Sequence, residues 1–243
     1  VNNGRTSPTQ ELVDAFGMNN GLPITDLNSG YNENEPYANR DLRFYATIFY
    51  DGADWLSRPV ETYEGGADKP GGVKQQTKTG YYLRKFMGNF EAAANYSNLN
   101  HDHILFRYAE ILLNYAEARN ETLAAPDQSV YQAIEKIRER AGLSPYELKT
   151  GLTKNQMREI IQQERRIELA FEEHRYYDVR RWKLADNAFN KELHAMVIYK
   201  TGSELIRQAS PVLQMNFEKK MYLAPIPFNE VIKNPQMVQN PAW

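Results

Sequence analysis

Residues 104–120 read ILFRYAEILLNYAEARN, and this stretch decides how the rest of the chain is interpreted. Its apolar side chains return at steps of three and four residues, which is the spacing of one helix face. The residues that define this face are Leu105, Tyr108, Ala109, Leu112, Tyr115 and Ala116. The pattern predicts a helix through about residue 120.

The same period continues downstream. A second apolar face runs from Val130 to Ala141, and Gly142 follows at the place where a helix C-cap is expected. Thr153 and Gln156 predict a capping box for a third helix, which we expect to run toward Trp182. Helices that open near residues 104 and 153 lie farther apart than the 34 residues of a standard tetratricopeptide repeat, so any repetition is degenerate.

Upstream of residue 104 the chain is rich in Asn, Gly, Pro, Asp and Tyr, a composition that favours turns and irregular backbone. Residues 9–16 predict a short helix, residues 43–50 a strand and residues 81–86 a weaker strand. Residues 51–80 predict a polar loop too long to be a simple connector, and such loops often carry binding sites.

The predicted fold is therefore mainly α. It has a tetratricopeptide-like helical scaffold, a large irregular loop-rich region and a few short strands. We divide the chain into a loop-rich, ligand-facing region at 1–103, a helical scaffold at 104–220 and an extended C-terminal tail at 221–243, which packs on the scaffold. Pro225 and Pro227 exclude helix from that part of the tail.

Composition narrows the classes of function. The chain has no cysteine, which excludes disulfides, thiolate metal sites and a cysteine nucleophile from it. A formal net charge of -2 gives no electrostatic reason to expect nucleic acid as a partner. No apolar run approaches the roughly 20 residues that a membrane-spanning helix needs. The start, Val1-Asn2-Asn3-Gly4, resembles neither an initiator nor a signal peptide, so we expect the chain to begin within a longer or processed protein.

Ionisable residues are densest at 164–175. Glu164 and Glu168 lie four residues apart and so side by side on one helix, whereas a glycosidase needs two carboxylates that flank a bond. We expect these glutamates to form an ion network with Arg107 or Arg138 of neighbouring helices, because buried charges need partners. No phosphate loop, dinucleotide motif or Gly-x-Ser-x-Gly elbow is present, so the sequence proposes no reaction and no cofactor.

Metal binding is not expected either. His101 and His103 are two residues apart, but a metal site would need a third protein ligand that the sequence does not display nearby. We predict that the four histidines are surface or hydrogen-bonded groups.

The polar loops carry the candidate ligand-binding residues. Tyr31, Trp55 and Tyr63 are the candidates for stacking on sugar rings, whose C–H faces pack on aromatic rings. Asn32 is the candidate polar contact, since sugar hydroxyls need both donors and acceptors. Trp55 can equally be a plug over the core, because tryptophan is highly buried on average.

Several strings resemble, in order and over almost the whole chain, the C-terminal part of SusD/RagB proteins. They are PTQELVDAF (8–16), PYANRDLRFYATI (36–48), YYLRKF (81–86), RYAEILLNYAEA (107–118), IRERAG (137–142), ERRIELAF (164–171), HRYYDVRRW (174–182) and QNPAW (239–243). The tail departs from the common ending in having Ala242 where glycine is usual. The family's N-terminal lipoprotein signal, lipidated cysteine and first helices have no counterpart in this chain.

The resemblance implies an outer-membrane lipoprotein on the surface of a Bacteroidetes-type cell, held there by an N-terminal lipid anchor absent from this chain. It implies that the protein holds oligosaccharide for a SusC-like TonB-dependent transporter and is not an enzyme. Three alternatives remain open: peptide binding, as in a RagB-like branch, a helical scaffold without a small ligand, and a glycoside hydrolase that uses Glu164 or Glu168.

Overall fold

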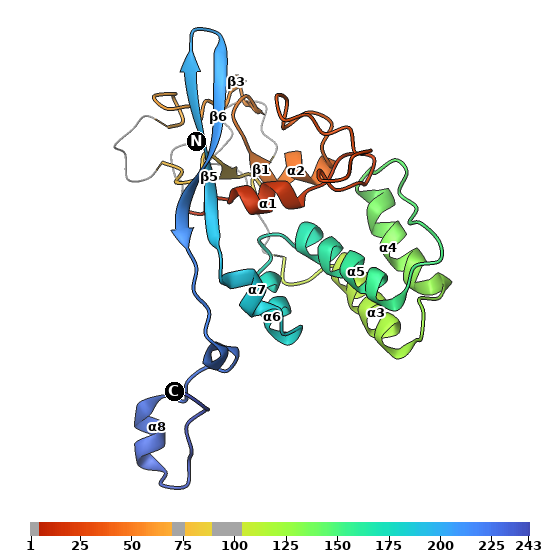
Figure 1. Cartoon of the computed structure of the whole chain (residues 1–243), viewed down its shortest axis with the longest axis vertical. Coiled ribbons are helices and arrows are strands. Elements are labelled where there is room, and N and C mark those ends of the chain that lie inside the picture. The colour runs from red at the N-terminus through yellow and green to blue at the C-terminus, as the bar shows by residue number, and fades with distance from the viewer. Residues whose placement is uncertain (1–4, 70–75, 89–103) are drawn as a thin grey trace.

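The computed structural model describes residues 5–69, 76–88 and 104–243. Helix α3 (Tyr108–Thr122) packs against both α4 (Gln128–Arg140) and α5 (Lys154–Glu168) on one side of the molecule (Figure 1). Their shared core contains Leu113, Ile134, Met157 and Ile161, each at most 1% exposed. These helices confirm the predicted helical scaffold.

Local signals begin and end these helices as the sequence predicts. The Thr153 side chain accepts the Gln156 backbone N–H, and the Gln156 side chain accepts the Thr153 N–H at 2.9 Å, which completes the capping box. The Asp127 carboxylate caps α4. After α4, Gly142 has φ of 78°, the left-handed conformation that a glycine C-cap supplies.

Three large apolar side chains of α3 are exposed. Tyr108, Ile111 and Tyr115 are each between 45% and 60% exposed, while Leu113 and Ala116 turn into the core. The sequence pattern assigned Tyr108 and Tyr115 to the buried face, but the structure places them at the exposed edge beside α4, where the Tyr115 hydroxyl donates to Ser129 and Lys136 lies over the Tyr108 ring. These three side chains form the α3 stripe.

The third predicted helix is interrupted. After α5 the backbone turns at Phe171 and Glu173, both with φ of 64°, and α6 (His174–Arg181) and α7 (Ala185–Phe189) follow. The turn places Glu172 where it accepts hydrogen bonds from Arg107 and Lys85.

The N-terminal part packs as loops around two aromatic clusters. It includes α1 (Gln10–Ala15), as predicted, and α2 (Leu42–Thr47). Among the described residues its strands are β1 (Ile48–Phe49), β2 (Asp54–Trp55), β3 (Arg58–Pro59) and β4 (Tyr82–Leu83); β1 pairs with β4, and β2 with β3.

The strand predicted at 43–50 is wrong for its first five residues, which belong to α2. The Asp41 carboxylate accepts the backbone N–H of Arg43 at 2.9 Å and so caps a helix. The helical turn buries Arg43, Phe44 and Thr47 together, and Arg43 thereby reaches acidic partners on α5. Tertiary ion pairing overrides the β-propensity of this segment.

A long antiparallel hairpin follows the helices. It is formed by β5 (Glu192–Thr201) and β6 (Glu204–Gln214) and stands beside the loop region (Figure 1). The range 104–220, predicted as a helical scaffold, is therefore helical only as far as Phe189, apart from one short 3-10 turn (Lys219–Tyr222). The hairpin is tied to the loops by two backbone hydrogen bonds of 2.8 Å, from Met196 to Thr79 and from Glu64 to Ile198.

The C-terminal residues form a separate small unit with α8 (Phe228–Lys233), which lies apart from α3–α5 in Figure 1. Its hydrogen bonds are largely internal, such as those from the Trp243 indole to the carbonyls of Lys220 and Leu223 at 3.0 Å. The predicted packing of the tail on the scaffold stays a prediction.

Candidate functional site

Glu164 and Glu168 lie side by side in a buried ion network on α5, so they do not flank a space that could hold a scissile bond. Arg43 Nη1 lies 2.5 Å from Glu164 and 3.0 Å from Glu168. Arg107 and Arg140 also pair with Glu168, and Arg138 is 3.9 Å from Glu164. The predicted network is confirmed, although Arg43 was not foreseen because its segment was predicted as a strand.

The electrostatics of this network oppose acid catalysis. Burial by itself raises the pKa of Glu168, but the hydrogen bond and charge of Arg107, with the charges of Arg43 and Arg140, outweigh it and lower the pKa to about 2. A glycosidase acid has the reverse environment, because it must keep its proton near neutral pH. These carboxylates hold the scaffold together.

Trp55 is the last residue of β2, just before the turn to β3, and is half-buried. Its ring packs edge-on against Phe49, with ring centroids 4.8 Å apart, over a cluster that includes Val60 and Tyr82. Part of the indole covers this cluster, as a plug over the core would, and part stays accessible; its contact with a ligand stays a prediction.

Tyr63 lies against the hairpin. The buried Asp51 carboxylate accepts the backbone N–H groups of Thr62 and Tyr63 at 2.8 and 3.2 Å, which fixes this loop. Lys200 of β5 places its ammonium 4.7 Å from the centre of the Tyr63 ring. The Tyr63 ring is therefore held between the loop and a cation of the hairpin.

Tyr31 and Asn32 lie on a neighbouring loop. Tyr31 is half-buried, with the guanidinium carbon of Arg40 5.7 Å from its ring centre. Arg40 is itself 1% exposed and donates to the carbonyls of Gly17, Pro36, Val13 and Phe16. Asn32 is exposed, and its side-chain oxygen accepts the Asn34 N–H at 3.0 Å in a tight turn.

One face of the hairpin joins these two loops. Ile198 is paired with Arg207, so their side chains and that of Lys200, two residues along β5, point to the same face. Arg207 donates to the Asn34 carbonyl at 3.4 Å, while Lys200 covers Tyr63. We call Tyr31, Asn32, Tyr63, Lys200 and Arg207 the loop–hairpin surface. Trp55 packs on a different cluster, that of Phe49.

Sequence reasoning missed Lys200 and Arg207 because it did not predict the hairpin. The sequence does contain a hairpin signal, because the Thr201-Gly202-Ser203 segment lies between two runs of β-prone residues. In the structure Gly202 has the positive φ of 64° that such a turn requires.

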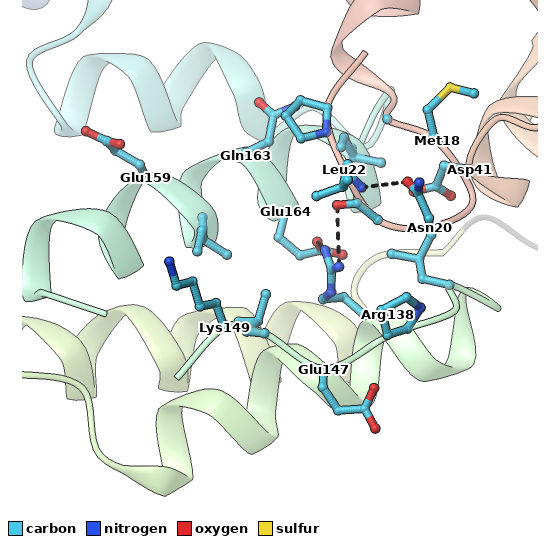
Figure 2. Close-up of a pocket in the computed structure, with 18 of the residues that line it drawn as sticks. Met18, Asn20, Leu22, Asp41, Arg138, Glu147, Lys149, Glu159, Gln163 and Glu164 are labelled. Atoms are coloured by element: carbon cyan, nitrogen blue, oxygen red, sulfur yellow. Dashed lines mark hydrogen bonds and ion pairs between the residues drawn. The ribbon is translucent and has the colours of Figure 1, made fainter. Parts of the chain in front are cut away.

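A pocket of about 540 Å³ lies elsewhere, between residues 15–23, residues 143–152 and α5 (Figure 2). None of the four predicted ligand-binding residues lines it. Within the described part of the chain, no three histidine or acidic side chains are grouped to hold a metal ion, and no helix is long and apolar enough to cross a membrane. His101 and His103 lie outside the described residues.

Comparison with known proteins places the chain in a family. A model of the SusD family matches residues 2–243. SusD-like protein P2 of Formosa agariphila is 36% identical over 145 residues, which are 57% of this chain and 25% of that protein. SusD-like protein P25 of the same organism is 45% identical over 92 residues, or 36% of this chain and 17% of that protein.

Solved structures agree. A SusD-like protein from Bacteroides fragilis superposes with a TM-score of 0.80 at 31% identity, over 98% of this chain and 47% of that one. A SusD-like carbohydrate binding protein from the same species gives a TM-score of 0.72 at 26% identity, over 94% of this chain and 47% of that one. The chain spans about half the length of these solved relatives, and it shares their tetratricopeptide-like helical fold. It belongs to the SusD family.

Proposed function

We propose that this protein binds oligosaccharide or polysaccharide at the cell surface without cleaving it and delivers it to a SusC-like TonB-dependent transporter. In this proposal an N-terminal lipid anchor holds the full-length protein on the outer membrane. The observation that carries the proposal is membership of the SusD family, one solved member of which is described as carbohydrate binding. Binding without catalysis is supported by the carboxylates of α5, which are engaged by arginines.

The proposed contacts are Tyr63, Tyr31 and Asn32 on the loop–hairpin surface and Trp55 beside it. Half-buried rings whose positions are fixed by packing suit sugar stacking, because little side-chain freedom is lost on binding. Lys200 and Arg207 add donors for hydroxyl oxygens next to these rings.

The test is calorimetry of the full-length protein, without its lipid anchor, against a panel of plant, host and microbial glycans. We expect saturable binding to one polysaccharide class, and a loss of at least tenfold in affinity in Trp55→Ala or Tyr63→Ala. Trp243→Ala and Tyr199→Ala are the matched controls, since both rings are partly exposed outside the proposed site. Unchanged affinity in Trp55→Ala and Tyr63→Ala would refute the site. The absence of a binding signal with every glycan of the panel would refute glycan binding.

Peptide capture is the second candidate. It is supported by the resemblance to SusD/RagB proteins, one branch of which handles peptides, and by the aromatic side chains of the loops, which can also contact apolar peptide side chains. Competition between the bound glycan and mixed peptides separates the two ligands. Hydrolysis is tested by new reducing ends that vanish in Glu168→Gln, and we expect none.

A further inference from the structure

The pocket beside α5 differs in chemistry from the loop–hairpin surface. Among the residues that line it there is no aromatic ring. Its walls are aliphatic and include Ala15, Leu22, Leu143, Leu148, Leu152 and Ile160. Its volume of about 540 Å³ is within the range of small-ligand sites. It therefore suits a ligand with an apolar group, and ring stacking has no part in it.

A buried ion pair with unused hydrogen-bonding capacity lines this pocket. Glu164 is 3% exposed, and its Oε1 accepts from Arg43. Within the described part of the chain its Oε2 makes no hydrogen bond, and Arg138 Nη1 is 3.9 Å away, too far for one. Figure 2 shows Arg138 and Glu164 next to each other among the lining side chains.

Backbone groups hold Arg138 in this position. Its Nε donates to the Tyr146 carbonyl at 2.8 Å, and its Nη2 approaches the Gly21 carbonyl at 3.5 Å. Gly21 has φ of 77°, and a Cβ there would lie 2.2 Å from Nη2. The guanidinium is thus fixed from two sides, and Nη1 is the nitrogen left to donate into the pocket.

A single hydroxyl completes this arrangement, because it accepts from an arginine N–H and donates to a carboxylate at the same time. The aliphatic walls call for a methyl or acetyl group near that hydroxyl. The lining carries three cationic side chains, Arg43, Arg138 and Lys149, and four acidic ones, Asp41, Glu147, Glu159 and Glu164. The charges nearly balance, so the lining suits an uncharged ligand.

We propose that this pocket is a second carbohydrate site, selective for a sugar residue that carries a methyl or acetyl group, with one hydroxyl bridging Arg138 and Glu164. The inference rests on the proposed glycan-binding function and adds a substrate class to it. An apolar peptide side chain could also pack on the aliphatic walls of the pocket. However, a ligand with many hydroxyls better matches the polar groups that line it, which are those of Asn20, Gln156, Gln163 and Lys149.

Ligand-observed saturation-transfer NMR on the full-length protein tests this proposal. The probes are two matched pairs, L-fucose with L-galactose and N-acetylglucosamine with glucose, and a leucine-containing tripeptide. Leu148→Trp fills the pocket from its wall, and Glu159→Trp covers it from an exposed position on α5 in case the first variant does not fold. Leu27→Trp, at a fully exposed leucine that does not line the pocket, is the control.

We expect the methyl or acetyl sugar of at least one pair to bind about fourfold or more tightly than its partner, the contribution of one buried methyl group. Its methyl protons should receive the strongest saturation, and both pocket variants should lose this binding while Leu27→Trp keeps it. Equal binding within both pairs, binding that survives in the folded pocket variants, or a response of the tripeptide alone would overturn the proposal. If the pocket proposal is overturned but a polysaccharide still binds through Trp55 or Tyr63, only the pocket inference has failed. If no glycan binds at all, the proposed function is refuted as well.

Discussion

Replacing Arg107 with methionine should lower the free energy of unfolding by an amount that depends on pH. Arg107 pairs with Glu168 and lies 2.8 Å from Glu172, and methionine keeps much of its apolar stem while removing the charge. Glu168 is buried and has a pKa of about 2, against 4.5 for an unperturbed glutamate. Because the folded pKa is the lower one, this group contributes stability that is fully present above pH 4.5 and is lost as pH falls toward 2.

The magnitude follows from that pKa. At about 1.4 kcal/mol for each pKa unit, Glu168 contributes about 3 kcal/mol at neutral pH, with Arg107 as the first of its charged partners. Removing one partner of a buried ion pair costs roughly 3–5 kcal/mol. Arg43 and Arg140 remain beside Glu168, so we expect the lower end, about 3 kcal/mol at pH 7. The difference from the unmodified protein should shrink as pH falls to 3.

Urea unfolding followed by circular dichroism, at pH steps from 7 to 3, measures this difference. The matched control is Arg158→Met, which removes an exposed pair with Glu121 and should cost less than about 0.5 kcal/mol at any pH. A loss in Arg107→Met that stays constant from pH 7 to 3 would show that Arg107 acts through packing. Equal losses in the two variants would refute the reasoning altogether.

Three further substitutions have expected outcomes. Thr153→Ala removes the capping box of α5 and should lower the unfolding free energy by about 1 kcal/mol in urea titrations, whereas Thr153→Ser should keep most of it. Gly80→Ala puts a Cβ 2.2 Å from the Met196 carbonyl at a φ of 79°, so hydrogen exchange at β5 should accelerate; unchanged exchange contradicts the close packing seen there. Arg40→Met leaves four carbonyls without their donor and should cost at least about 3 kcal/mol in thermal or urea unfolding, and a loss under 1 kcal/mol would mean that water replaces the guanidinium.

The scaffold was predictable because its signals are local. The apolar period of residues 130–141, the glycine after it and the Thr153 capping box each depend on residues within a few positions of one another. The segment at 43–50 was predicted wrongly, although the Asp41 cap of α2 is a local helix signal. Its aromatic and β-branched residues favour a strand, but Arg43 meets Glu164 and Glu168, more than a hundred residues later, and only the folded chain shows that contact.

The candidate site was likewise predictable only in part. Tyr31, Asn32, Trp55 and Tyr63 could be selected from composition, but the hairpin residues beside the Tyr63 ring and the Asn34 loop could not, because they come from distant positions in the sequence. Lys200 reaches Tyr63 from a hairpin whose pairing depends on register, and Arg207 reaches the Asn34 loop in the same way. The role of the four residues in binding stays a prediction.

The α3 stripe bears on how this protein has to be handled. Tyr108, Ile111 and Tyr115 each leave about half of their side-chain surface exposed to solvent beside α4, in a chain that spans about half the length of its solved relatives. Recombinant material with these boundaries should therefore be colloidally unstable, with self-association that rises with concentration and with temperature near ambient. Apparent ligand affinities measured on it would mix ligand binding with aggregation, and light scattering alongside each titration would separate the two.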